Sequence, residues 1–342
     1  MPVKKIQIVS LSKGILGEDF IAHELKIGIE RLQAYGVEVC FSKHALKGMA
    51  FLEQNPQARA EDLLQAFADD SIDMILCAIG GDDTYRLLPY LFENDELAHV
   101  AKQKVFLGYS DTTVNHFMLH KLGLHSFYGQ SFLSDVCELD KEMLPYSKFY
   151  FEELLHTGRI TEVQASPLWY EERNDFSPQA VGTAMPSHTN HGFELLQGKP
   201  AFEGKILGGC IETMYDMFNN TRHTDSVALC NKYQLFPSLA DWKGKILLLE
   251  SAENKSSTEQ YRKMLQALAN FGIFDVVNGV FVGKPANNCY YEEYKDILPE
   301  VIANKKLPIV YNVNIGHANP RCILPLGVPA KVDVAKQKIS FE

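Results

Sequence analysis

The chain has 342 residues, more than one average hydrophobic core accommodates, so it predicts two domains or one large α/β domain. A net charge of −10 and the absence of any run rich in Lys and Arg argue against nucleic acid and membrane surfaces as partners. Seven scattered cysteines without a CxxC pair favour reduced thiols in a cytoplasmic protein over disulfides or a zinc site. No apolar run has the length of a membrane span, and residues 1–20 favour a first strand over a signal peptide.

Short β-branched runs alternate with amphipathic stretches in the first half of the chain. We expect strands over 4–11, 37–42, 72–79 and 104–109, and helices over 19–36, 58–69, 84–92 and 111–123. This alternation predicts a parallel sheet with helices on both faces, a Rossmann-like arrangement.

The segment 166–200 is polar and contains prolines, with little periodicity. We interpret it as a connection between two domains, and loops of this length often carry function. Beyond it the patterns are mixed, with strands expected over 244–251 and 276–284 and a helix over 257–272. The predicted organisation is an N-terminal domain over 1–165, a connecting substrate loop over 166–200, and a smaller, β-rich mixed α/β domain over 201–342.

Ser110 stands between a strand end and a helix start, in the stretch KVFLGYSDTT. A serine at such a place is usually an N-cap, whose hydroxyl accepts a hydrogen bond from a backbone N–H. A nucleophile on a tight turn needs a small residue two positions earlier, which Gly108 supplies, and a helix N-terminus that stabilises negative charge. Thr112 replaces the second glycine of the full G-x-S-x-G elbow, so these residues alone leave both interpretations open.

A second turn, IGGDD at 79–83, follows the preceding strand. Paired glycines there let the backbone approach a ligand closely, and their N–H groups bind anions. An ordinary turn between strand and helix fits the same pattern. The fingerprint G-x-G-x-x-G is absent, which argues against a dinucleotide cofactor and a dehydrogenase.

Two residues in the second half are candidates for an acid and a base. Glu250 ends an apolar strand, where α/β enzymes keep functional groups, although exposed strand-end acids are also common. His317 lies in the turn-rich segment NIGHANP, where an imidazole projects from a strand end into a cleft. His116 and His120 lack the acidic residue of an H-E-x-x-H motif and favour a helix face over a metal site.

Six stretches occur together in the order found in one family. They are the run from 58 to 91, LGYSDTTVNHFMLHKLGLHSFYGQ, FEGKILGGCIETM, GKILLLESAE, FGIFDVVNGVFVGK and NIGHANPRCILPLG. With them the chain resembles the LD-carboxypeptidase and microcin C immunity family of serine peptidases over nearly its whole length. The coincidence of several ordered motifs favours the nucleophile over the cap for Ser110.

The resemblance implies a catalytic triad of Ser110, Glu250 and His317, with Ser110 in the first domain and the other two in the second. It places the oxyanion hole at the backbone amides of Gly81 and Asp111. It also implies a cytoplasmic homodimer that uses no metal and no cofactor. One departure makes Glu253 a rival for the orienting role, because Ser251 follows Glu250 where the family usually has aspartate.

Two features resemble the microcin immunity branch more than the murein branch. The GG turn continues as DDTYRLLPYL, and the segment 166–200 holds Trp169, which in that branch is a loop tryptophan stacked on the nucleobase of a peptidyl nucleotide. The predicted substrate contacts are therefore Gly80, Asp82 and Trp169, and the predicted substrate is a small peptide conjugate such as a peptidyl or aminoacyl nucleotide. The alternatives are a murein tetrapeptide LD-carboxypeptidase and a non-catalytic small-ligand-binding protein.

Overall fold

The first half of the chain forms a largely parallel sheet in the computed structural model, which describes residues 1–342. Its strands are β1 (Lys5–Val9), β2 (Glu38–Phe41), β3 (Met74–Cys77), β4 (Val105–Gly108) and β5 (Ser126–Tyr128), with β14 (Leu324–Leu326) added at one edge. The order is β14-β5-β4-β3-β1-β2, and only β14 is antiparallel to its neighbour. The predicted strands of this half are confirmed, and the sheet additionally takes a strand from the end of the chain.

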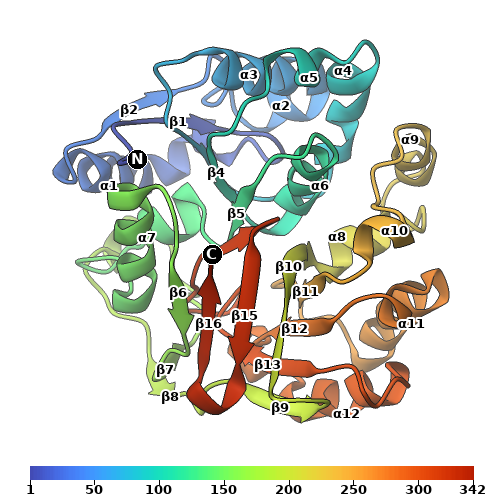
Figure 1. Ribbon diagram of the computed structural model, residues 1–342. Coiled ribbons are helices and arrows are strands. Elements are labelled where there is room, and N and C mark those ends of the chain that lie inside the picture. Colours follow the sequence, from blue (N-terminus) through green and yellow to red (C-terminus); the bar gives the residue numbers. More distant parts are fainter.

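Helices cover both faces of this sheet, as the alternation of elements predicted (Figure 1). They are α1 (Ala22–Ala34), α2 (Met49–Gln54), α3 (Pro56–Ala68), α4 (Leu88–Phe92), α5 (Glu96–Val100), α6 (Thr113–Lys121) and α7 (Pro145–Thr157). Side chains of α3, α4 and α6 pack with Val9 and Ile75 on one face. Those of α1 and α7 pack with Ile8 and Leu76 on the other. Alternate strand residues therefore enter different cores, and both faces are buried.

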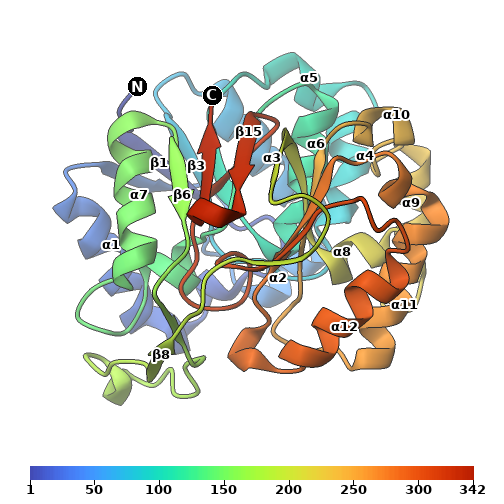
Figure 2. The ribbon, with the colours of Figure 1, turned by 60° about the horizontal axis from the view of Figure 1, so that its bottom comes forward.

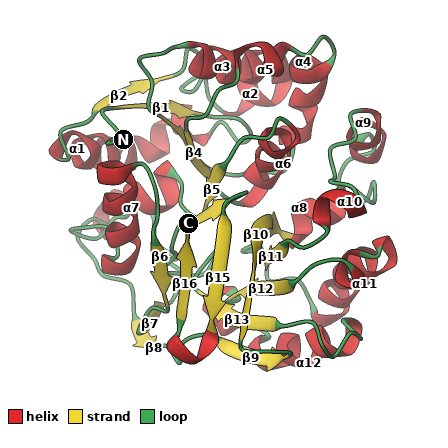
Figure 3. Ribbon diagram, in the orientation of Figure 1, coloured by secondary structure: helices red, strands yellow, loops and turns green.

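The second half forms an eight-stranded mixed sheet. Its strands, in spatial order, are β6 (Glu162–Gln164), β16 (Lys338–Phe341), β15 (Pro329–Asp333), β10 (Ala201–Cys210), β11 (Ile246–Glu250), β12 (Gly279–Gly283), β13 (Ile309–Val313) and β9 (Glu194–Gln197). The four strands from β10 to β13 are parallel, and the flanking strands are antiparallel. The helices are α8 (Ile211–Asp216), α9 (Ser226–Lys232), α10 (Leu239–Trp242), α11 (Thr258–Phe271) and α12 (Tyr291–Val301). This mixed α/β half completes the predicted fold class (Figure 3).

The segment 166–200 is more ordered than its composition suggested. It contains the antiparallel hairpin of β7 (Leu168–Tyr170) and β8 (Ser187–Thr189), and then β9, which pairs with β13. Figure 2 shows the hairpin and its connecting loop projecting from one end of the molecule. Chain segments also cross between the sheets, because β14 joins the first and β6 the second. The boundaries at 165 and 200 stay a prediction.

The two halves pack against each other through shared hydrophobic cores. Each of the two clusters contains residues from both halves of the chain, for example Phe117 on α6 with Trp242 on α10 in one, and Tyr128 on β5 with Phe281 on β12 in the other. This packing holds the carboxyl ends of the parallel strands of both sheets close together, where α/β proteins place their ligands. The structure has no helix whose length and apolar character suit it to crossing a membrane.

Candidate active site

Ser110 follows β4 with only Tyr109 between them, at the start of a single 3-10 turn that leads into α6. Its backbone φ is +65°, in the left-handed region that a non-glycine residue rarely adopts. The hydroxyl caps no helix; Ser110 Oγ lies 3.0 Å from Nε2 of His317. The geometry thus favours the nucleophile over the cap, because the strained turn directs the hydroxyl across the gap between the two sheets.

Glu250 and His317 both lie at the carboxyl edge of the parallel strands of the second sheet. Glu250 is the last residue of β11 and is 1% exposed, and His317 lies in the turn after β13 and is 8% exposed. Glu250 Oε2 lies 2.7 Å from His317 Nδ1 and also accepts the His317 backbone N–H at 3.3 Å. Gly316 allows this approach, because it has φ +86° and a Cβ there would lie 2.4 Å from Glu250 Oε2. Ser110, His317 and Glu250 therefore form one continuous chain of contacts.

Tyr128, on β5, closes this chain into a ring. Its hydroxyl donates to Glu250 Oε1 at 2.6 Å and accepts the backbone N–H of Ser110 at 3.1 Å. The side chain is fully buried, and burial followed by the adjacent Glu250 raises the pKa of the phenol well above 10. Tyr128 thus joins the backbone of one sheet's serine to the carboxylate of the other sheet. Sequence reasoning missed it, since Tyr128 and Glu250 lie in different sheets and meet only through tertiary packing.

The GG turn, which follows β3, lies against the serine. A Cβ on Gly80 would lie 2.6 Å from the Ser110 Cβ, 2.8 Å from its Oγ and 3.2 Å from the Asp111 amide nitrogen. Only glycine leaves room for this contact. Gly81 and Asp82 follow it along the cavity wall. The role of the Gly81 and Asp111 amides as oxyanion donors stays a prediction.

A buried polar network fixes this turn from behind. Ser12 Oγ donates to Asp111 Oδ2 at 2.7 Å and accepts the Asp82 N–H at 3.1 Å. Arg59, which is fully buried, binds Asp83 through two hydrogen bonds of 2.6 and 3.0 Å. A bidentate pair of this kind has a fixed geometry, so the GG turn is held rigidly beside Ser110. No sequence signal identified Ser12 or Arg59, which lie far from the turn along the chain.

Charge around His317 favours its protonated form. Burial lowers the pKa of His317, but the carboxylate of Glu250 and a second contact with Glu253 outweigh it and raise the pKa well above 6.5. Glu253 Oε2 lies 3.0 Å from Nε2, the same nitrogen that faces Ser110 Oγ. The hydrogen bond with His317 lowers the pKa of Glu253 to about 2. Glu250 thus contacts Nδ1 and Glu253 contacts Nε2 on the opposite side of the ring, and the orienting role of Glu250 stays a prediction.

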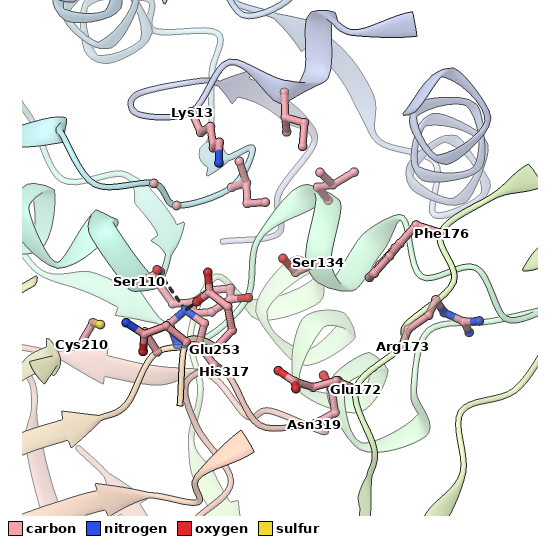
Figure 4. A pocket seen from close by; sticks show the side chains of 18 of the residues that line it. Lys13, Ser110, Ser134, Glu172, Arg173, Phe176, Cys210, Glu253, His317 and Asn319 are labelled. Carbon is pink, nitrogen blue, oxygen red and sulfur yellow. Dashed lines mark hydrogen bonds and ion pairs between the residues drawn. The ribbon is translucent and has the colours of Figure 1, made fainter. Parts of the chain in front are cut away.

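A cavity of about 760 Å³ opens at this group of residues (Figure 4). Ser110, His317, Glu253 and Cys210 lie together in one part of the view, with Lys13 across the cavity from them. Phe176 and Arg173 lie at another side, on the loop between β7 and β8. Part of the lining is apolar; it includes Ile15, Phe20, Ile21, Leu133, Met185 and Phe176, the last of which lies away from the serine. A ligand that joins a polar reacting group to a flatter apolar group fits this shape.

Trp169 lies outside the lining of this cavity. It is on β7, where its ring stacks on His188 at 4.5 Å between centroids, and Lys284 Nζ lies 5.0 Å from its ring centroid. Its predicted contact with a substrate stays a prediction. His116 is buried, and its ring nitrogens lie 2.7 Å from Ser126 Oγ and 3.1 Å from the Gly108 carbonyl oxygen. It packs in the protein interior, and no group of three or more His, Cys, Asp or Glu is arranged to hold a metal ion.

Comparison with known proteins agrees with this architecture. A crystal structure of an MccF-like protein from Streptococcus pneumoniae in complex with AMP has 61% sequence identity and a TM-score of 0.99, covering 99% of this chain and 99% of that one. The microcin C7 self-immunity protein MccF of Escherichia coli is 24% identical over 92% of this chain and 85% of its own length. A probable murein peptide carboxypeptidase of Bacillus subtilis is 25% identical over 91% of this chain and 84% of its own length.

Two family models match the two halves of the chain. The model of the LD-carboxypeptidase N-terminal domain matches residues 6–129, and that of the LD-carboxypeptidase C-terminal domain matches residues 203–332. The first match contains Ser110 and the GG turn, and the second contains Glu250 and His317. The chain belongs to the LD-carboxypeptidase family of peptidases.

Proposed function

We propose that the protein is a serine peptidase that cleaves the acyl–nitrogen bond of a small aminoacyl or peptidyl nucleotide. The observation that carries this proposal is the unbroken chain from Ser110 Oγ through the His317 imidazole to Glu250, with distances of 3.0 and 2.7 Å. This is the arrangement of nucleophile, base and orienting acid that acyl transfer needs. It opens into a cavity large enough for a nucleotide conjugate.

In the reaction, His317 Nε2 takes the hydroxyl proton while Ser110 Oγ attacks the carbonyl carbon. The carbonyl oxygen becomes an oxyanion, which the backbone amides of Gly81 and Asp111 stabilise. The carbon–nitrogen bond then breaks as the leaving nitrogen takes the proton from His317. Water attacks the acyl-serine with His317 again as the base, which releases the acid and restores Ser110. Glu250 stabilises the imidazolium in both halves of the reaction.

The cavity suggests where the parts of such a substrate lie. Phe176 and Phe20 supply aromatic surface at the partly apolar lining, and Lys13, which has an exposed side chain and no ion pair, is placed to meet a phosphate. Base stacking on aromatic rings is a common mode of nucleobase binding. We propose that the nucleobase stacks on Phe176, on the loop before β8. Trp169, the residue chosen from the sequence, is the alternative. The AMP bound by the pneumococcal relative supports a nucleotide as ligand.

A murein tetrapeptide is the second candidate substrate, because a probable murein peptide carboxypeptidase is among the relatives. The partly apolar end with its exposed aromatic residues favours a nucleotide over a flexible polar peptide. A non-catalytic ligand-binding role would not need the strained Ser110 backbone or the buried Glu250. A homodimer in the cytoplasm stays a prediction.

The test measures hydrolysis of an aminoacyl sulfamoyl adenosine and of a murein tetrapeptide by the wild-type protein and by Ser110→Ala. We expect the wild type to cleave the nucleotide analogue with the higher kcat/KM, and Ser110→Ala to lower that rate by ~10⁴ to 10⁶-fold. The variant should keep the wild-type melting temperature, since the hydroxyl caps no helix. A higher kcat/KM for the tetrapeptide would move the proposal to the murein branch. Equal rates for the two proteins would refute the serine mechanism.

A further inference from the structure

Glu253 competes with Ser110 for one nitrogen of His317. It lies in the loop that follows β11, and its Oε2 is 3.0 Å from Nε2, the same distance at which Ser110 Oγ lies. Its side chain is 69% exposed and lines the cavity. Glu253 is therefore a largely exposed acidic side chain in direct contact with Nε2 of His317, the nitrogen that faces Ser110. Glu250 contacts the opposite nitrogen, Nδ1.

The two contacts require different protonation states of the ring. A carboxylate only accepts hydrogen bonds, so Glu253 binds Nε2 only when that nitrogen carries a proton. Nδ1 already donates to Glu250, and a ring with both protons is the imidazolium. To take the proton of Ser110, Nε2 must instead offer its lone pair. The contact with Glu253 thus stabilises the form of His317 that is inactive as a base.

The charged surroundings leave few other partners for Glu253. Apart from His317, the cation whose charge lowers the pKa of Glu253 is Arg222. Arg222 itself pairs with Asp216 at 3.4 Å. The remaining neighbours of His317 are Glu250 on β11, the Tyr109 ring at 5.0 Å after β4, and Arg321, which donates to the His317 carbonyl oxygen. The lining near the serine also contains Asp82 and Glu212. Acidic groups thus outnumber cations where the acyl part of a substrate would lie.

We infer that Glu253 is a specificity-determining residue, which favours substrates with a free ammonium group beside the scissile carbonyl. Such an ammonium offers the carboxylate a new partner and draws it away from His317, which then releases its Nε2 proton to solvent water and accepts the proton of Ser110. An N-acylated substrate offers no charge at this place, so His317 stays paired with Glu253. The inference rests on the proposed acyl transfer and names the chemical class of its acyl group.

The first experiment needs no turnover. The imidazole pKa of His317 is measured by NMR in the free wild-type protein and in Glu253→Gln. We expect the substitution to lower this pKa by about one unit or more, because a carboxylate in contact with the ring is removed. Glu171→Gln is the matched control, since Glu171 pairs with the distant His188 and does not line the cavity. An unchanged pKa in Glu253→Gln would overturn the inference.

The second experiment compares an aminoacyl sulfamoyl adenosine with its N-acetyl derivative. We expect wild-type kcat/KM near neutral pH to favour the free amine by about tenfold, the size of one charge-assisted hydrogen bond, and Glu253→Gln to lose that preference. The variant's acid limb of kcat/KM should also move to lower pH. A preference retained in full by Glu253→Gln would overturn the inference. If the wild type cleaves neither compound, the proposed function fails, and the NMR titration alone decides the pairing of Glu253 with His317.

Discussion

The carboxyl edges of the two sheets contribute differently to the site. The edge of the first sheet supplies neutral groups that act through their position, namely the strained Ser110 and the GG turn. The buried Arg59–Asp83 pair holds this turn in place. The edge of the second sheet supplies titratable groups, Glu250 and His317. The difference indicates that one edge sets geometry and the other sets proton affinity. Changes at the first edge should lower kcat at every pH, and changes at the second should also move the pH profile.

The largest effect on this comparison is expected from Glu250→Gln. We expect kcat/KM to fall by ~10³ to 10⁴-fold, because the imidazolium loses its partner. The acid limb should move to lower pH. Glu250 raises the pKa of His317, and the base works only when deprotonated, so removing the charge extends activity toward acid. The pH dependence of kcat/KM measures both effects. A fall in rate with an unmoved acid limb would contradict the division between the two edges.

Gly80→Ala tests the first edge. A Cβ there would lie 2.6 to 2.8 Å from Ser110 atoms, so the GG turn must move away from the serine. Loss of an oxyanion donor typically costs ~10² to 10³-fold in kcat. We expect a fall of that size with an unchanged acid limb, measured by steady-state kinetics across pH. Gly123→Ala, at an open position with φ +74°, serves as the control and should leave kcat unchanged. A shift of the acid limb of the pH profile in Gly80→Ala would contradict the division between the two edges.

Tyr128→Phe tests the one side chain that touches both edges. Without its hydroxyl, Glu250 loses the donor to Oε1 and the Ser110 N–H loses its acceptor. We expect kcat to fall by about tenfold. The acid limb should move to higher pH, opposite to Glu250→Gln, because a carboxylate with fewer donors attracts the His317 proton more strongly.

Tyr150→Phe is the control for that substitution. Tyr150 is also a buried tyrosine, and its hydroxyl accepts the Gln164 N–H at 2.9 Å far from the serine. It should change the melting temperature without changing the pH profile. If the acid limb of Tyr128→Phe lies at the same pH as that of the wild type, Tyr128 has a purely structural role.

The smallest effect is expected where neither edge is touched. Phe176→Ala should raise KM for a nucleotide substrate about fivefold with kcat unchanged, the loss of one stacking surface. Trp169→Ala should leave KM within about twofold, since Trp169 lies outside the cavity lining. Steady-state kinetics measures both KM values. A larger rise in KM for Trp169→Ala than for Phe176→Ala would assign nucleobase binding to Trp169.

The sequence located the residues that lie in local motifs. GYSD, the GG turn, the strand end at Glu250 and the turn at His317 each have a local signal, and a shared order of motifs joined them. Residues that act through distant pairing carried no such signal. Tyr128 meets Glu250 across 122 positions, and Arg59 reaches Asp83 from α3. The placement of β14 in the first sheet and β6 in the second is likewise set by tertiary packing. The sequence places Trp169 in the segment 166–200, but single-sequence patterns do not show its stacking on His188.

The most direct measurement of the central claim is rapid-quench mass spectrometry of the peptide that contains Ser110, during turnover of an aminoacyl sulfamoyl adenosine. The account predicts that this peptide gains the mass of the acyl group within one turnover. It also predicts that Glu250→Gln, which slows both halves of the reaction, still acylates the same residue. Product release at the wild-type rate with no acyl group ever found on Ser110 would contradict the account.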